Sequence, residues 1–161
     1  ICSVLVLGAD QLTKYLVAAD FTLGETRDFL PGLIDFTYIH NRGGAWGMLY
    51  GHTYILLPVT VVIMVLCVFL YIKYGKKSKL LFWAIALVLS GGTGNMIDRV
   101  FRGGNVVDFL HFEFFPSFPV FNVADCAIVV GAGLLILYFI IDTVKDYRLK
   151  NSGGESDGKQ D

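Results

Sequence analysis

The sequence predicts an all-α membrane protein with four transmembrane helices, a small extracytoplasmic β element and an aromatic outer loop. Two observations lead to this fold class. Of the 161 residues, 55% are hydrophobic and only 17% are charged, and the mean hydropathy is +0.61. A soluble domain of this size cannot bury so many apolar side chains. The apolar residues also gather in runs that reach the roughly 20 residues of helix that a bilayer core requires.

Three of these runs carry almost no charge. Residues 54–72 and 80–97 contain no charged side chain, and residues 120–141 contain only Asp125, near the start of the run. Each run is long enough to cross the hydrocarbon core as a helix. We therefore expect three spans from these runs alone.

The first run, residues 1–19, is the fourth expected span, although it contains Asp10 and Lys14. The two residues are spaced i, i+4, so both side chains lie on one helix face and neutralise each other against the bundle interior. The same charges, and the lack of a clear small-residue cleavage site, favour a retained helix over a cleaved signal peptide.

Lysines predict the orientation of the spans. The link between the second and third runs and the segment after the fourth run are both basic; they hold Lys73, Lys76, Lys77 and Lys79, and Lys145, Arg148 and Lys150. The other two connections carry arginines mixed with acids. The positive-inside rule therefore places this link and both termini in the cytoplasm, with residues 20–53 and 98–119 facing outward.

The chain is predicted to form one domain. Residues 1–150 make a single four-helix transmembrane domain, and residues 151–161, which are rich in Gly, Ser and charge, make a disordered cytoplasmic tail. The net charge of −1 offers no basic stripe for nucleic acid. No internal repeat supports an inverted-repeat transporter.

The two outward segments have a distinctive composition. Residues 33–40 are rich in β-branched and aromatic residues, follow the turn signal Pro31-Gly32 and precede the turn cluster 41–44, which predicts a small β element on the outer membrane surface. Residues 109–121 are crowded with Phe and interrupted by prolines. They indicate a loop that dips into the interface, and an ordinary aromatic belt explains them equally well.

Three acids share one predicted depth. Asp98, Asp108 and Asp125 all fall at the outer ends of spans or between them, and Asn95 and Asn122 precede Asp98 and Asp125 by one helical turn. Carboxylates beside membrane spans are costly and typical of functional sites. Two of them a few ångströms apart share one proton, so that one activates water while the other donates a proton to a carbonyl oxygen. That is the arrangement of aspartic proteases, and it uses no metal.

The position of Arg99 indicates which two of the three acids form the reactive pair. Next to Asp98, it is interpreted as a partner that keeps Asp98 ionised and structural, which leaves Asp108 and Asp125 as the reactive pair. Simpler interpretations stay open: Asp98-Arg99 as a buried ion pair only, and Asp125 as a helix cap only. A proton-coupled transporter or channel and a structural membrane adaptor also remain, although the cytoplasmic halves of the second and fourth runs offer almost no polar path.

Other potential catalytic groups give weaker signals. His40, His52 and His111 are scattered without metal-ligand spacing, so a zinc site is not expected. Ser90 has no nearby basic partner, and Cys126 has no His on its helix, so both are interpreted as packing residues. The glycines of residues 91–94 favour the close approach of another helix or of a bound chain.

Five short blocks, in this order and spacing, resemble the signature blocks of a known family. They are residues 10–14 (DQLTK), 41–47 (NRGGAWG), 94–99 (GNMIDR), 106–109 (VVDF) and 121–125 (FNVAD). The family is bacterial lipoprotein signal peptidase (signal peptidase II), an aspartic peptidase family. Gly44 departs from the alanine of many members, and Trp46 stands where Phe is also usual.

The resemblance implies an aspartic endopeptidase of the bacterial cytoplasmic (inner) membrane with its active site on the extracytoplasmic side. Its substrates are diacylglyceryl-modified prolipoproteins, cleaved just before the lipidated cysteine, and the cyclic peptides globomycin and myxovirescin inhibit it. The catalytic dyad falls on Asp108 and Asp125. The matching positions that bind substrate or support the site are Asn41, Asn95, Asp98, Arg99, Asn122, Asp10 and Lys14. We expect a monomer in contact with membrane lipid, without cofactor, metal or nucleic acid.

Overall fold

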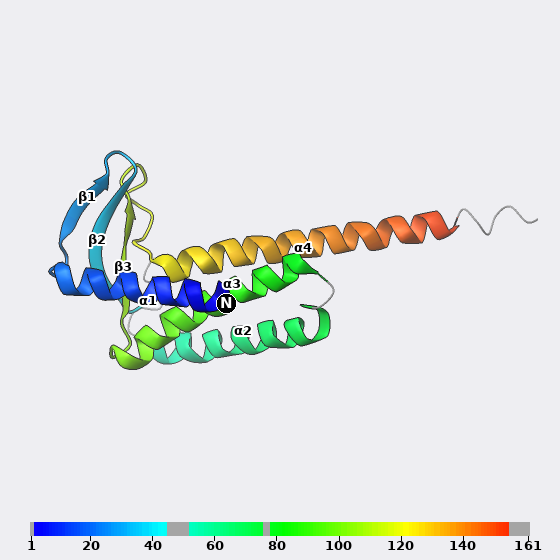
Figure 1. The fold of residues 1–161 in the computed structure, drawn as a ribbon, viewed down its shortest axis with the longest axis horizontal. Coiled ribbons are helices and arrows are strands. Elements are labelled where there is room, and N and C mark those ends of the chain that lie inside the picture. The colour runs from blue at the N-terminus through cyan, green and yellow to red at the C-terminus, as the bar shows by residue number, and fades with distance from the viewer. Residues whose placement is uncertain (1, 45–51, 76–77, 155–161) are drawn as a thin grey trace, which may run out of the picture.

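The computed structural model describes residues 2–44, 52–75 and 78–154 (Figure 1). For residues 2, 53 and 152–154 it describes the backbone only. Several predictions fall outside the described residues: the end of the second motif with Trp46, two of the lysines in the basic link (Lys76 and Lys77), and the tail from residue 155 onward.

Helices dominate the described part of the chain, and a small sheet stands at one end of them (Figure 1). The helices are α1 (Cys2–Asp20), α2 (Thr53–Tyr74), α3 (Lys79–Phe101) and α4 (Val123–Gly154). Within the described residues, α2, α3 and α4 are long and apolar enough to cross a membrane. The helix α1 forms where predicted but is not among these three, since Asp10, Lys14 and other polar residues lower its apolar content.

Two helices, α3 and α4, differ from the prediction in their boundaries. Helix α3 continues to Phe101 and so takes Asp98 and Arg99 into its last turns. Helix α4 begins at Val123 rather than at residue 120, because Phe121 is extended and forms an isolated bridge with Leu110. It then runs to Gly154, so residues 151–154 at the start of the predicted tail are helical.

The predicted β element is present and larger than expected. It is an antiparallel sheet in the order β1 (Thr26–Leu30), β2 (Ile34–Asn41) and β3 (Val106–Phe112). Strand β2 matches the predicted segment, whereas β3 takes in the start of the stretch that was expected to be an aromatic loop. The pairing of Ile39 with Asp108 and of Asn41 with Val106 brings both outward segments together in one sheet.

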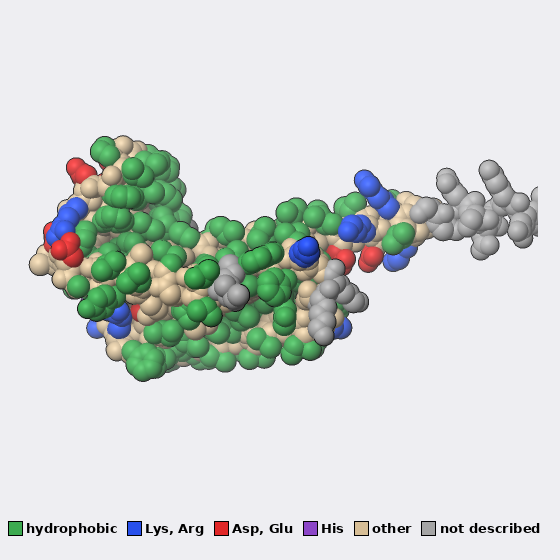
Figure 2. Space-filling model, viewed as in Figure 1, with side chains coloured by type: hydrophobic (Ala, Val, Ile, Leu, Met, Phe, Trp, Pro, Cys, Tyr) green, Lys and Arg blue, Asp and Glu red, His purple; other side chains and the backbone are tan. Residues whose placement is uncertain are grey.

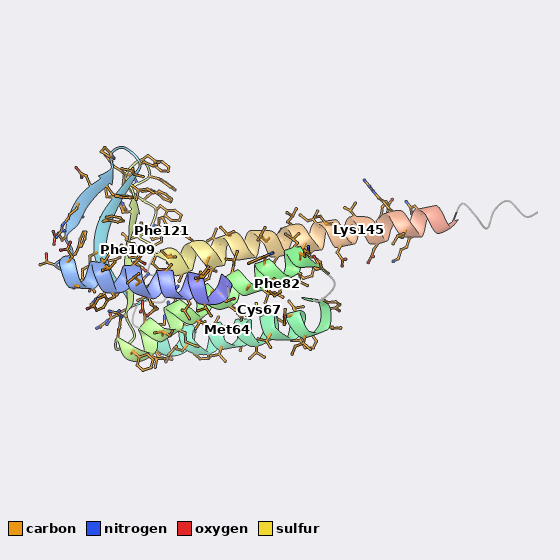
Figure 3. All side chains as sticks on the ribbon, viewed as in Figure 1. Met64, Cys67, Phe82, Phe109, Phe121 and Lys145 are labelled. Carbon is orange, nitrogen blue, oxygen red and sulfur yellow. The ribbon has the colours of Figure 1, made fainter. Side chains whose placement is uncertain are left out.

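Packing joins these elements in two places. Val17 of α1 and Tyr38, Val107 and Phe109 of the sheet form one buried cluster, and Figure 3 shows Phe109 where the sheet meets the helices. A second cluster, Cys67, Leu81, Ile85 and Val88, joins α2 to α3.

Helices α3 and α4 approach each other through glycine. A Cβ at Gly91 would collide with the backbone oxygen of Ala124, and a Cβ at Gly131 would lie 2.8 Å from the backbone oxygen of Ala84. Such contacts are typical of small residues at helix interfaces in membranes. The expected close approach of another helix at residues 91–94 is therefore confirmed. It fixes the start of α4 against the middle of α3.

The surface of the helices is strongly apolar. Figure 2 shows hydrophobic side chains over most of their visible face, with charged side chains gathered beside the sheet and on the far part of α4. Even Val62 and Ile72 of α2 are 66% and 73% exposed. In water this surface would be costly, and it is typical of helices that cross a membrane.

Candidate active site

Asp108 and Asp125 line the same pocket. Asp108 lies on β3 and is buried, and Asp125 lies in the first turn of α4. The pocket has a volume of about 420 Å³ and sits where the sheet meets the C-terminal end of α3 and the N-terminal end of α4. Its polar wall also includes Asn41, Asn95 and Arg99, and its apolar wall consists mainly of Val106, Phe118, Pro119, Val120, Phe121, Ile128 and Val129.

Both carboxylate oxygens of Asp108 accept hydrogen bonds from amide side chains. Asn41 Nδ2 donates to Oδ2 at 2.8 Å, and Asn122 Nδ2 donates to Oδ1 at 2.6 Å. Asn41 is the last residue of β2, and its own Oδ1 accepts from the backbone of Gly43 at 2.9 Å. The turn that follows β2 therefore fixes the amide that holds Asp108.

Asp125 takes part in the cap of its helix as well as in the pocket. Asn122 Oδ1 accepts from the backbone N–H of Asp125 at 2.9 Å, and the backbone N–H of Asn122 donates to Asp125 Oδ2 at 3.1 Å. This reciprocal pair is a capping box. The other oxygen of Asp125 accepts from Asn95 Nδ2 at 2.8 Å. Asp125 therefore takes part in the helix cap, and the same carboxylate also lines the pocket.

Asn122 connects the two acids. Its backbone N–H bonds to Asp125 and its side-chain amide to Asp108, and that amide also donates to Asn95 Oδ1 at 3.1 Å. Asn122 is completely buried. The amide groups therefore hold the two carboxylates in a fixed relation without placing a positive charge between them.

The electrostatic environment favours a proton on Asp108. Burial raises the pKa of Asp108 from 3.8 to about 7, and the nearby charge of Asp125 adds to the rise, while hydrogen bonds from Asn41 and Asn122 oppose it. Burial and a neighbouring negative charge are the two effects that let one of two paired acids keep its proton to a higher pH. Near neutral pH, this pocket therefore holds a carboxyl group that can donate a proton.

A buried ion cluster lies beneath the pocket and includes Asp10, Lys14 and Asp98. The ammonium of Lys14 contacts Asp10 Oδ2 at 3.0 Å and Asp98 Oδ2 at 2.9 Å, and all three side chains are shielded from solvent. The other oxygen of Asp10 accepts from the backbone N–H of Ala124 at 2.9 Å. The predicted neutralisation of Asp10 by Lys14 is confirmed, and the cluster ties α1 to α3 and to the start of α4.

The interpretation of Arg99 as the partner of Asp98 is wrong. Among the described residues, Asp98 pairs with Lys14 and with Arg102, whose Nε lies 3.1 Å away, and not with Arg99. The reason is helical geometry: neighbouring residues point about 100° apart, whereas residues i and i+4 share a face. Arg102 is the residue that the sequence reasoning missed, and its i+4 spacing from Asp98 is the signal that identifies it.

Arg99 instead lines the pocket. Its Nη1 donates to the backbone oxygen of Asn95 at 3.3 Å, and its Nε has no hydrogen-bond partner among the described residues. Its guanidinium group therefore retains donor capacity beside the two acids, where a carbonyl oxygen of a bound chain can accept from it.

The remaining candidates stay away from the pocket. His40 bonds to the hydroxyl of Tyr38 at 2.9 Å, and His111 lies 4.0 Å from Asp35. The hydroxyl of Ser90 donates to the backbone oxygen of Ala86. In the part of the chain that the structure describes, no three His, Cys, Asp or Glu side chains gather as metal ligands.

The apolar helices and the buried acid-lined pocket define a membrane enzyme, and solved structures agree. One bacterial membrane enzyme superposes with a TM-score of 0.81 at 35% identity, covering 88% of this chain and 86% of that one. A second gives a TM-score of 0.76 at 34% identity, with coverage of 85% and 88%.

Sequence comparisons identify the family. The family model described as signal peptidase (SPase) II matches residues 2–141. The lipoprotein signal peptidase of Enterococcus faecalis is 43% identical over 140 residues, which are 87% of this chain and 86% of that protein. The one from Bacillus pumilus is 42% identical over 137 residues, covering 84% and 88%. The chain belongs to the signal peptidase II family and is a multi-pass membrane peptidase, and the predicted resemblance is confirmed.

Proposed function

We propose that this protein removes signal peptides from diacylglyceryl-modified prolipoproteins, with Asp108 and Asp125 as its catalytic dyad. The observation that carries this proposal is that both acids line one pocket and are joined through Asn122. Lipoprotein signal peptidases are its named relatives. Among the activities considered, only peptide hydrolysis uses such a pair without a path to the other side of the membrane.

Water is the nucleophile in the proposed mechanism, and Asp125 is the base. Asp125 sits in the first turn of α4 and accepts from a backbone N–H there, which stabilises its ionised form. It takes one proton from water as the water oxygen attacks the scissile carbonyl carbon. Asp108, whose pKa is raised to about 7, donates its proton to the carbonyl oxygen.

The second step restores the dyad. The tetrahedral intermediate collapses as its C–N bond breaks, and the leaving nitrogen takes the proton held by Asp125. A hydroxyl of the intermediate returns a proton to Asp108 as the new carboxyl group forms. No bond between enzyme and substrate is made, because water supplies the new oxygen.

Neighbouring polar groups orient the substrate. Asn41 and Arg99 both line the pocket, and within the described residues the Nε of Arg99 has no hydrogen-bond partner. In the proposal Arg99 donates a hydrogen bond to a substrate carbonyl. Asn41, whose NH₂ group already donates to Asp108 and Gly44, accepts a substrate N–H at its Oδ1, while Asn95 and Asn122 fix the dyad. Asp10, Lys14 and Asp98 support the site through the buried ion cluster.

We further propose that α1 is the fourth span of a single domain formed by residues 1–150. Two of its charged side chains, Asp10 and Lys14, are buried, and the third, Asp20, lies at its end, while Val4, Leu5 and Tyr15 are more than half exposed. Such a helix presents apolar atoms to lipid in spite of its charges. With four spans and basic residues around residue 73 and after residue 144, both termini are cytoplasmic and the pocket opens on the outer side of the cytoplasmic membrane.

The remaining partners follow from this assignment. The proposed enzyme acts as a monomer in contact with membrane lipid, and globomycin and myxovirescin inhibit it by occupying the pocket of Asp108 and Asp125. The amide and guanidinium donors of that pocket suit the many carbonyl oxygens of a cyclic peptide.

The deciding experiment is a gel-shift cleavage assay with purified protein and a lipidated prolipoprotein. Asp108→Asn and Asp125→Asn should each lower turnover at least about a thousandfold, because each removes a proton-transfer group. Asp28→Asn is the matched control, since Asp28 is an exposed acid on β1 outside the pocket. Near-normal turnover in either dyad variant would remove that residue from the mechanism.

A further inference from the structure

A second hollow lies beside the pocket, at the junction of β3 and α4. Its volume is about 270 Å³, and it is lined by Phe112, Phe118, Phe121, Asp125, Cys126, Val129 and Val130. Four of these residues, Phe118, Phe121, Asp125 and Val129, also line the pocket of the proposed dyad. A group bound in the hollow is therefore only a few atoms away from a bond held between the two acids.

The hollow and the pocket differ in chemistry. The surface lining the hollow is apolar, whereas the pocket presents Asn41, Asn95 and Arg99. A peptide backbone carries an N–H and a C=O at nearly every residue, and burying them without partners is costly. The pocket therefore suits a peptide backbone and the hollow suits hydrocarbon.

Aromatic rings form one wall of the hollow. The ring of Phe112 lies 5.4 Å from that of Phe118 and 4.9 Å from that of Phe121, and the last two rings are 5.7 Å apart. Figure 3 shows Phe121 in the corner between the sheet and α4, and hydrophobic side chains cover this corner in Figure 2. The wall is aromatic and apolar, and so offers a large hydrophobic contact area to a hydrocarbon chain.

The opposite side of the hollow opens along α4. Val129 and Val130 are 70% and 55% exposed, and they lie on a helix that is apolar enough to cross the membrane. A chain longer than the hollow can therefore continue along α4 into lipid. A peptide side chain would end inside the hollow and make no use of this exit.

We propose that this hollow binds an acyl chain of the lipoprotein substrate while the scissile peptide lies in the adjoining pocket. The proposal rests on the proposed function. Asp125 then lies between the peptide part of the substrate, in the pocket, and its acyl part, in the hollow. Val130 becomes a residue that determines specificity for the lipid.

The kinetic test compares two prolipoprotein peptides whose lipidated cysteine carries either palmitoyl or butanoyl chains. The readout is the ratio of kcat/KM for the long-chain substrate to that for the short-chain substrate, which the wild type should hold well above one. Val130→Trp fills the hollow and should lower this ratio by about tenfold or more, the order expected when a few methylene contacts are lost.

Ile136→Trp is the matched control. Ile136 is 63% exposed on the same helix but does not line the hollow, so its substitution should leave the ratio unchanged. An unchanged ratio in Val130→Trp, or an equal fall in both variants, overturns the acyl assignment. If the wild type cleaves neither peptide, the proposed function fails instead.

A cross-linking test uses the wild-type protein and so does not depend on folding of a variant. A substrate with a diazirine on the acyl chain near the glycerol should label the hollow, at Phe118, Cys126 or Val130. Labels confined to α2, or to α4 from Ile136 onward, would overturn the proposal. So would labelling of the hollow by a diazirine placed on a signal-peptide side chain in place of the acyl label.

Discussion

The ammonium group of Lys14 lies 3.0 Å from the side-chain oxygen of Asn95. Since that oxygen accepts from Lys14, the NH₂ group of the same amide faces Asp125, to which it donates at 2.8 Å. A charge on α1 thus sets the orientation of an amide on α3 that holds an acid on α4. The buried ion cluster and the proposed dyad are therefore one connected network, although Asp10, Lys14 and Asp98 do not themselves line the pocket.

Replacing Lys14 with Met should destabilise the protein by about 3–5 kcal/mol, because Asp10 and Asp98 would remain buried without this cation. The Asn95 amide would also lose the contact that orients it, so turnover at temperatures below unfolding should fall as well. Thermal unfolding and cleavage measured on the same preparation check both effects. Lys145→Met is the control, because Lys145 lies on the exposed far part of α4 (Figure 3). Equal unfolding temperatures in the two variants would contradict the role of the cluster.

Asp98→Ala should lower stability more than it lowers intrinsic turnover. Asp98 accepts from Lys14, Arg102 and the backbone of Val107, but it does not line the pocket. Losing these buried contacts should cost about 3 kcal/mol. The measurement is the unfolding temperature together with the single-turnover rate at low temperature. Normal melting combined with no cleavage would make Asp98 a catalytic residue instead.

Substitutions of Arg99 and Arg102 should affect different properties, substrate binding and stability respectively. Arg102→Leu removes a partner of Asp98 and should lower the unfolding temperature, whereas Arg99→Leu leaves that ion pair intact and should mainly raise KM. The expected rise in KM is about tenfold or more, the value of one charge-assisted hydrogen bond. Each variant is the control for the other. A lower unfolding temperature for Arg99→Leu alone would restore the Asp98–Arg99 pair that the geometry excludes.

Part of this site could be predicted from the sequence, because the apolar runs and the lysines beside them predict how deep each residue lies in the membrane. Lysine positions predict the orientation of the spans, and the predicted orientation places Asp98, Asp108 and Asp125 at one level. The partner of Asp98 was predicted wrongly, because adjacency in sequence was preferred to the i+4 spacing that leads to Arg102. Strand β3 was missed since its hydrogen bonds depend on pairing with β2, a contact between residues far apart in the chain.

Activity should be insensitive to metal chelators. In the proposed mechanism Asp125 activates the water and Asp108 polarises the carbonyl, so neither step requires a Lewis acid. Turnover in EDTA should match that of the untreated enzyme. A zinc peptidase assayed in parallel controls for the strength of the chelator. Activity that is lost in EDTA and restored by added zinc would refute this mechanism.

The raised pKa of Asp108 predicts how stability and activity depend on pH. The pKa of Asp108 is about 7 in the folded protein, whereas the ordinary value for an aspartate is 3.8. The folded state therefore binds this proton more tightly than the unfolded state does. The contribution of protonated Asp108 to stability is therefore fully present below about pH 4, declines between about pH 4 and pH 7, and is lost above about pH 7.

Removing the titrating group tests this sign directly. Asp108→Asn cannot ionise, so its stability relative to the wild type should increase between pH 4 and pH 8, by an amount that approaches about 4 kcal/mol at roughly 1.4 kcal/mol per pKa unit. Denaturant unfolding in detergent at several pH values gives this difference. Asp28→Asn, on the exposed strand β1, should show no such trend. In the wild type, kcat/KM should fall above about pH 7 as the proton donor is lost. A stability difference that stays flat, or that changes in the opposite direction, would place the shared proton elsewhere.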